Sequence, residues 1–200
     1  MTLGARRRVE QGRYYWRMNQ WYFPFYTMIA PVPGVGAYAA RMWVPMDDTH
    51  VNIICTTYTP ERPCTEQELA NWRAGQNSHA QVAPGTHRPI ANRDNNYLID
   101  RDVQRTQTFT GIDGVRAQDA AMTESPGPIS DRTKEHLGSS DTAVIRMRRL
   151  LLEGAKALAR GEEPAAAKGG ELYHVRSHSV VIDAEGEFDQ QPEILRAMGM

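Results

Sequence analysis

The feature that most constrains the fold is an amphipathic helical pattern over residues 141–160. Apolar side chains recur there at helical spacing and form one face: Val144, Met147, Leu151, Ala155 and Leu158. Ser139–Asp141 can cap the start of this helix, and Gly161 can end it. We expect the helix to lie across a sheet, with the opposite face toward water. The expected solvent-facing side chains are Arg146, Arg149 and Glu153.

The first sixty residues carry the patterns of antiparallel strands. Arg13–Ile29 is dense in Tyr, Trp and Phe, which favours a strand that Pro24 would end or confine to a sheet edge. Tyr38–Val44 and His50–Tyr58 are predicted as two further strands around a turn at Pro45–Asp48. Residues 1–12 are charged, and we expect a loop or an irregular start there.

The remaining elements have shorter signals. Thr65 with Glu68 forms a capping-box pattern, which predicts a short helix that Gly75 ends. Residues 76–103 show no periodicity and are expected to be a long loop. Gly114–Thr123 predicts another short helix. We divide the chain into residues 1–161 and a C-terminal extension, residues 162–200, with one strand within residues 171–183 and a tail over the last dozen residues.

Composition excludes several classes of function. The chain has 200 residues and a net charge of −1, so no basic excess indicates nucleic-acid binding. No long apolar run indicates a membrane span, and no apolar segment follows the N-terminal arginines as in a secretory signal. Cys55 and Cys64 form no metal-binding spacing, and two reduced thiols in a cytoplasmic protein are the expected state.

Gln104–Asp141 is the stretch richest in residues that do chemistry, and it has few aliphatic residues. Polar stretches of this kind are costly to order unless they line a site or an interface. The chain has no G-x-S-x-G motif and no phosphate-binding glycine loop. His174 and His178 are expected on a strand, where residues four apart stand roughly 13 Å from each other, so they do not predict a metal pair. Asp119, taken alone on a short helix, would usually be a solvated or capping carboxylate.

Several motifs resemble a known family. The matching segments are TFTGIDG (Thr108–Gly114), QDAAMTES (Gln118–Ser125) and GPISDRTKEHLGSSD (Gly127–Asp141), with YYWRMNQWYFPFYTMIAP upstream. Together they resemble the C-terminal catalytic domain of Rieske non-haem iron aromatic ring-hydroxylating oxygenases, alpha subunit, in the phthalate dioxygenase-like branch. The resemblance implies an α+β helix-grip domain of the START or Bet v1 type, in which an antiparallel sheet packs on a long C-terminal helix. The predicted strands and the predicted helix over residues 141–160 are compatible with it.

The resemblance also implies a reaction and its cofactors. Family members hold a mononuclear Fe(II) with two histidines and one carboxylate, beside an aromatic substrate and dioxygen. Asp119 matches the carboxylate ligand, and Gln118, Met122 and Thr123 are candidates to support that ligand or to line the substrate pocket. Electrons come from a [2Fe–2S] Rieske cluster, usually that of the neighbouring subunit. A reductase or ferredoxin is the expected electron-transfer partner, and the family forms trimer-type homo-oligomers.

The chain departs from the family pattern at its N-terminal side. It has no CxH or CxxH cluster motif and no histidine before His50, so the cluster ligands and two of the three iron ligands are expected to be missing. We therefore expect an N-terminally truncated catalytic domain, inactive alone, whose Rieske domain could come from a separate chain. An alternative is a non-catalytic helix-grip module that binds a hydrophobic or aromatic ligand. Arg17 and Arg41 could face a substrate carboxylate, although arginines in such positions more commonly lie at the surface.

Overall fold

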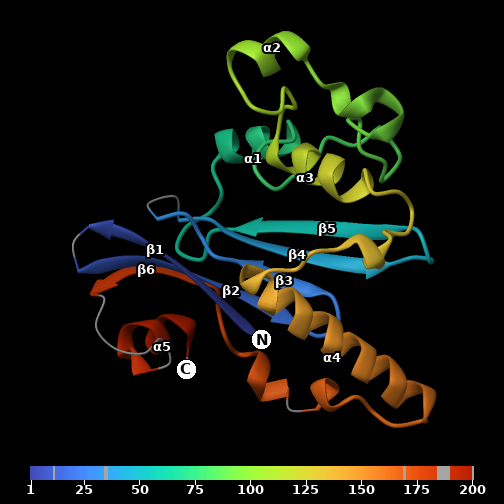
Figure 1. The fold of residues 1–200 in the computed structure, drawn as a ribbon. Coiled ribbons are helices and arrows are strands. Elements are labelled where there is room, and N and C mark those ends of the chain that lie inside the picture. The colour runs from blue at the N-terminus through green and yellow to red at the C-terminus, as the bar shows by residue number, and fades with distance from the viewer. Residues whose placement is uncertain (11, 34–35, 169, 184–189, 200) are drawn as a thin grey trace. The chain divides into compact units, whose positions relative to one another are not determined.

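The computed structural model describes residues 1–10, 12–33, 36–168, 170–183 and 190–199 (Figure 1). Its described residues divide into two compact units. The sheet unit comprises Met1–Val44, Thr56–Thr59 and His136–Met200, and the loop unit comprises Pro45–Cys55 and Pro60–Glu135.

Antiparallel pairing organises the strands around β2. The described strands are β1 (Thr2–Glu10), β2 (Arg13–Tyr22), β3 (Tyr26–Ile29), β4 (Tyr38–Pro45), β5 (Val51–Tyr58) and β6 (His178–Asp183). Their order is β1-β2-β3-β4-β5, and β6 also pairs with β2. One edge of β2 pairs with β1 along its length, whereas the other edge pairs first with β6 and then with β3. The C-terminal strand is thus built into the sheet beside the longest strand.

The N-terminal residues differ from the sequence prediction. The loop expected over residues 1–12 is wrong, because β1 pairs with β2 from Thr2 to Glu10. Guanidinium groups of β1 lie over aromatic rings of β2. The Arg6 guanidinium lies 4.7 Å from the centre of the Tyr14 ring, and the Arg7 guanidinium lies 5.2 Å from the centre of the Tyr15 ring. Arg13–Ile29 forms two strands rather than one, because the chain turns back at Phe23–Phe25.

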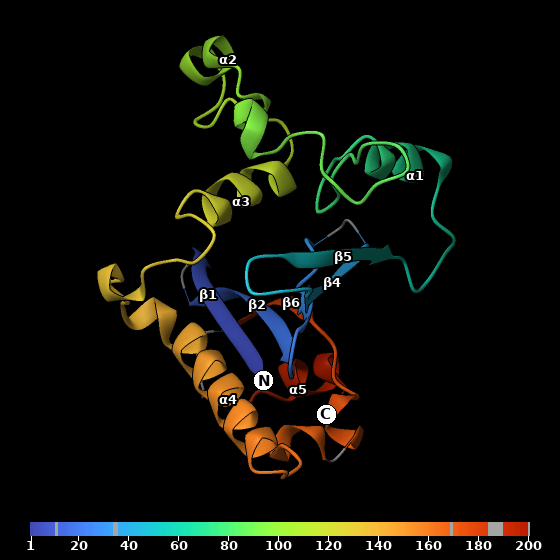
Figure 2. The same ribbon diagram turned by 90° about the vertical axis from the view of Figure 1, so that its right-hand side faces the viewer.

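Two helices pack on opposite faces of this sheet (Figure 2). The helix α4 (Thr142–Ala159) begins after Asp141 and confirms the helix predicted there. Ala155 and Leu158, which were expected on its sheet-facing side, are exposed. It approaches the sheet closely at Gly154, where an added Cβ would stand 2.6 Å from Phe23 Cζ. On the other face, α5 (Pro192–Met198) completes a core of four buried side chains: Met18, Ile182, Ile194 and Met198. The α+β helix-grip prediction, with an antiparallel sheet and a long C-terminal helix, is confirmed.

Details of the C-terminal half differ from the expectation. The strand expected within residues 171–183 is β6, preceded by the short 3-10 helices η4 (Ala165–Ala167) and η5 (Gly170–Tyr173). Where the sequence suggested a tail, the structure has α5, whose Ile194 is fully buried; residues 189 and 200 of that tail lie outside the described residues. The described part of residues 162–200 belongs to the sheet unit, and the division at residue 161 stays a prediction.

The loop unit is held mainly by short helices and capping contacts. They are α1 (Glu66–Arg73), η1 (Arg93–Leu98), α2 (Arg101–Thr106), α3 (Val115–Glu124) and η2 (Arg132–Lys134); η3 (Ser139–Asp141) precedes α4 in the sheet unit. The predicted capping box is confirmed: Glu68 N donates to Thr65 Oγ1 at 3.2 Å, and Thr65 N donates to Glu68 Oε2 at 2.8 Å. In the parts of the chain that are described, no helix is long and apolar enough to cross a membrane.

Candidate functional site

A cavity lies between the sheet and the N-terminal half of α4, within the sheet unit. Its volume is about 280 Å³, and its walls are largely apolar. Trp21, Ile29 and Trp43 line it from the strands, and Val144 and Met147 line it from α4. Farther along its length, α4 approaches the sheet closely at Gly154. A cavity of this size and lining is suited to one aromatic ring with small substituents.

Strand register explains which side chains face this cavity. Trp21 pairs with Thr27, and Thr27 pairs with Arg41, so the three side chains lie side by side on one face. Trp43, two residues after Arg41, follows on the same face, and its Nε1 donates to Thr27 Oγ1 at 3.3 Å. The alternate residue Met18 points to the other face, into the core with α5. Strand periodicity therefore separates the cavity from the filled core.

Arg41 gives the cavity a buried positive charge. Only 9% of this residue is exposed, and its guanidinium lies 6.0 Å from the centre of the Trp43 ring. No acidic side chain is present among the residues found to line the cavity. Arg17 is half-buried, and its Nη2 donates to the Ala30 carbonyl at 2.8 Å. Arg41 is therefore buried, whereas most arginines in such strand positions lie at the surface.

Asp119 lies midway along α3, in the loop unit. It is half-buried and shares one side of the helix with Val115 and Met122, which are 54% and 74% exposed. Two neighbouring side chains bond to nearby backbone instead: Gln118 Nε2 donates to the Ile112 carbonyl at 2.9 Å, and Thr123 Oγ1 donates to the Asp119 carbonyl at 2.9 Å. The structure thus places the candidate carboxylate on a partly apolar, solvent-facing side of α3.

The donors around Asp119 do not make a complete iron site. Its carboxylate is the type of hard oxygen ligand that Fe(II) accepts in a two-histidine, one-carboxylate set. Within the residues that the structure describes, however, no group of three or more His, Cys, Asp or Glu side chains could hold a metal ion. Asp119 is the right type of ligand for the proposed iron site. The described residues around it, however, do not supply the three ligands that such a site needs.

Two of the histidines lie at or next to the start of a strand. His50 follows the turn between β4 and β5, where its Nδ1 lies 2.9 Å from Asp47 Oδ1. Hydrogen bonds from the Thr49 backbone and the His50 ring lower the pKa of Asp47 to about 2. His50 is therefore part of the hydrogen-bond network of this turn. His178 begins β6, where burial lowers the pKa of its ring.

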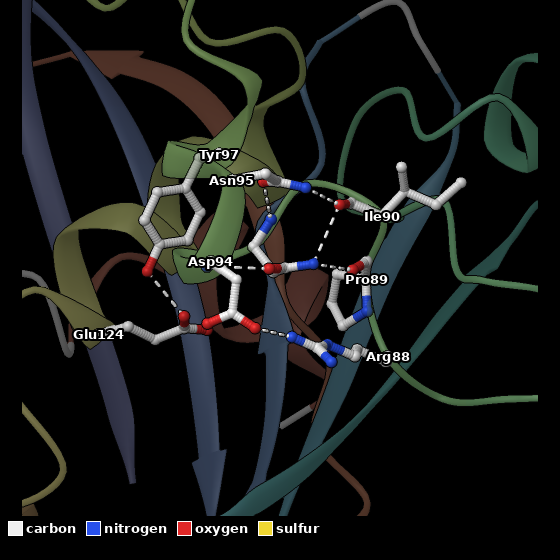
Figure 3. A network of polar contacts seen from close by, with 8 residues as sticks. Arg88, Pro89, Ile90, Asp94, Asn95, Tyr97 and Glu124 are labelled. Carbon is white, nitrogen blue, oxygen red and sulfur yellow. Dashed lines mark hydrogen bonds and ion pairs between the residues drawn. The ribbon is translucent and has the colours of Figure 1, made fainter.

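A polar network between residues 88 and 124 was not visible in the sequence (Figure 3). Three consecutive residues, Asn96, Tyr97 and Leu98, have φ of +51°, +55° and +54°. Each such non-glycine residue costs roughly 1–2 kcal/mol. Tyr97 is 9% exposed, and its hydroxyl donates to Glu124 Oε2 at 2.7 Å. Burial and this hydrogen bond raise the pKa of Tyr97 to about 12.

Comparison with known proteins identifies the family. The family described as "LigXa C-terminal domain like" matches residues 5–191. The chain belongs to this family. Its relatives include the oxygenase subunit of 3-chlorobenzoate-3,4-dioxygenase from Comamonas testosteroni, which is 32% identical over 82% of this chain and 41% of the relative. The phthalate 4,5-dioxygenase oxygenase subunit from Pseudomonas putida is 36% identical over 62% of this chain and 28% of the relative.

These matches confirm the resemblance recognised in the sequence motifs. The LigXa C-terminal-like chain is homologous to the catalytic region of aromatic dioxygenase oxygenase subunits. The chain spans less than half the length of either of these two relatives. For this chain, the reaction, the substrate and the partners of a complete oxygenase are therefore proposals.

Proposed function

We propose that the chain is the catalytic-domain part of an aromatic ring-hydroxylating, or aryl ether O-demethylating, oxygenase and that it binds an aromatic carboxylate. The observation that carries this proposal is the cavity of about 280 Å³ with Arg41 in its wall. The names of the two relatives, which refer to 3-chlorobenzoate and phthalate, also point to aromatic carboxylates.

The chemistry of the cavity suits a ligand with an apolar ring and one negative group. A carboxylate removed from water needs a charged or hydrogen-bonding partner, and a guanidinium offers two parallel donors to it. Trp21 and Trp43 offer flat apolar surfaces to an aromatic ring. Arg41 would therefore orient the carboxylate, while the ring would lie among the tryptophans and the α4 side chains.

Asp119 is proposed as one iron ligand of the complete enzyme. The exposed apolar side chains of Val115 and Met122, on the same side of α3, support the docking of a segment that carries further ligands. Gln118, Met122 and Thr123 remain candidates to support Asp119. The same proposal includes a Rieske cluster carried by a separate chain, an electron-donating reductase or ferredoxin, and a trimer-type homo-oligomer. Cytoplasmic location is also part of the proposal.

Calorimetric titration with benzoate and 3-chlorobenzoate tests the carboxylate site. We expect binding by the wild-type chain and a loss of at least about tenfold in affinity in Arg41→Met, which removes the charge and keeps the apolar stem. Arg17→Met is the matched control, because Arg17 bonds to the Ala30 backbone. Equal affinity in Arg41→Met, or no binding by the folded wild type, would contradict the proposal.

Neutral ligands distinguish the second candidate function, a non-catalytic helix-grip module for hydrophobic or aromatic molecules. The apolar cavity suits this alternative as well as it suits the first proposal. The incomplete set of metal ligands among the described residues is also compatible with it. Such a module would bind toluene at least as well as benzoate, and Arg41→Met would strengthen toluene binding. Preference for benzoate by the wild type, lost in Arg41→Met, would support the carboxylate site instead.

Titration with Fe(II) under anaerobic conditions tests the role of Asp119. One carboxylate holds this ion weakly, so we expect weak binding by the chain alone and weaker binding still in Asp119→Asn. Glu124→Gln, which changes a carboxylate on the same helix, is the control. Tight stoichiometric binding by the wild-type chain, or binding that Asp119→Asn leaves unchanged, would show that Asp119 is not a single ligand of an incomplete site.

A further inference from the structure

The helix α3 packs over a cavity inside the loop unit. This cavity has a volume of about 140 Å³ and is lined by Arg116, Ala117 and Ala120 of α3 and by Leu98 and Ile90 of the preceding loop. Side chains beneath a helix normally fix its position by close packing. Because part of that packing is absent under α3, contacts at the two ends of the helix gain importance.

The N-terminal end of α3 is held by backbone contacts. Gly114 precedes the helix with φ of +80°, and an added Cβ there would stand 3.0 Å from the Gly75 carbonyl oxygen. In the first half of the helix, Gln118 Nε2 donates to the Ile112 carbonyl at 2.9 Å. These contacts fix the start of α3 against the loop before it. They leave the last turn, at Glu124, to be held by other residues.

At the C-terminal end, Tyr97 supplies such a contact. Its ring is buried, and its hydroxyl donates to Glu124 Oε2 at 2.7 Å (Figure 3). Glu124 is the last residue of α3. A hydroxyl that donates to a carboxylate makes a stronger hydrogen bond than one between two neutral groups. The contact joins the last turn of α3 to the left-handed segment Asn96–Leu98.

The segment that carries Tyr97 is itself fixed by several hydrogen bonds (Figure 3). Asn92 Oδ1 accepts from Asp94 N at 3.0 Å, and Asn95 Oδ1 accepts from Asn92 N at 2.9 Å. The Ile90 carbonyl accepts from Asn95 Nδ2 at 2.7 Å, and Arg88 pairs with Asp94. Unfavourable left-handed backbone persists only where surrounding contacts determine it in this way. These contacts hold the turn that carries Tyr97, and so they hold Tyr97 in position next to α3.

We propose that Tyr97 is a positioning residue for α3, and that its hydrogen bond to Glu124 sets the position of the helical turns that carry Asp119. Asp119 lies five positions before Glu124, so a shift of the last turn moves its carboxylate as well. The functional meaning of this contact rests on the proposed role of Asp119. The contact itself is testable without any metal.

Hydrogen–deuterium exchange of the full chain measures whether α3 depends on Tyr97. We expect Tyr97→Phe, which keeps the ring and removes the hydroxyl, to speed exchange of the α3 amides by about tenfold or more. Exchange in α1 and in the strands should not change. Tyr38→Phe, which removes a hydroxyl in the sheet unit, is the matched control. Unchanged α3 exchange in folded Tyr97→Phe would overturn the proposal.

A pair of substitutions at Glu124 separates the hydrogen bond from the general effect of mutation. Glu124→Gln keeps an oxygen acceptor for the Tyr97 hydroxyl, so α3 exchange should stay close to that of the wild type. Glu124→Ala removes the acceptor and should match Tyr97→Phe. Equal exchange in the Gln and Ala variants would overturn the proposal. These results do not depend on the Fe(II) titration, so failure of the iron proposal and failure of this one are distinguishable.

Discussion

The two faces of the sheet in the sheet unit are packed in different ways. On the face toward α5, Met18 and Ile194 have no exposed surface and Ile182 and Met198 are nearly as buried. On the face toward α4, the strands and the helix enclose a cavity of about 280 Å³ around Arg41. The face toward α5 is closely packed with side chains, whereas the face toward α4 borders a cavity. The filled face contributes packing to stability, and the proposed function places ligand binding on the other face.

The largest effect should follow from a truncation on the filled face. Met18→Ala should lower the free energy of unfolding by about 2–5 kcal/mol, because Met18 is fully buried and its removal leaves a cavity. Chemical denaturation measures the change. A loss well below 1 kcal/mol would mean that this face is no better packed than the cavity face.

Gly154→Ala should have the next largest effect. Alanine favours a helix by about 1 kcal/mol over glycine, yet its Cβ would stand 2.6 Å from Phe23 Cζ. We expect a net loss of about 1–2 kcal/mol, since α4 has to move from the sheet at this contact. Ala155→Gly, one residue on and exposed, is the control for helix propensity alone. Stabilisation by Gly154→Ala would show that α4 is not held by this close approach.

Alkaline pH should weaken the filled face through Tyr22. Burial raises the pKa of this phenol to about 12, and its hydroxyl donates to the Val175 carbonyl at 2.5 Å. A raised pKa in the folded state means that the stabilisation is complete below about pH 10 and is lost as the pH rises through about 12. Denaturation between pH 9 and pH 12 should therefore show a steeper fall for the wild type than for Tyr22→Phe. Parallel curves would contradict this assignment.

The smallest effect on stability should come from Arg41→Met on the cavity face. Arg41→Met keeps the apolar stem of this side chain and removes a buried charge, whose desolvation opposes folding. We expect a change within about 1 kcal/mol of zero, although the same substitution should abolish most carboxylate binding. Thermal melting provides the measurement. A loss as large as that of Met18→Ala would make Arg41 a structural residue of the core.

The sequence was sufficient for elements that local patterns encode. The apolar spacing from Val144 to Leu151 predicts α4, and Thr65 with Glu68 predicts the start of α1. β1 was missed because its charged residues are stabilised by pairing with β2, which no local pattern displays. The helix α5 was missed because its burial comes from residues far away in the chain, such as Met18.

The candidate site was predictable only in part. Asp119 is a candidate because its motif resembles that of a family, whereas the burial of Arg41 depends on register between β3 and β4 and on where α4 lies. Alternation along the strand predicts which residues lie on the same face as Arg41. It does not predict which of the two faces is closely packed and which borders a cavity. The left-handed residues Asn96–Leu98 carry no glycine signal, so nothing in the sequence marks the turn that presents Tyr97.

Methyl resonances of methionine test the central claim most directly, because Met147 lines the cavity and Met18 and Met198 lie in the core on the opposite face. With ¹³C-methyl-labelled methionine, saturating 3-chlorobenzoate should shift the Met147 resonance through the ring of the ligand. The Met18 and Met198 resonances should stay in place, and Arg41→Met should remove the Met147 shift. An unmoved Met147 resonance at saturation, or equal shifts at Met18 and Met198, would contradict an aromatic carboxylate site between the sheet and α4.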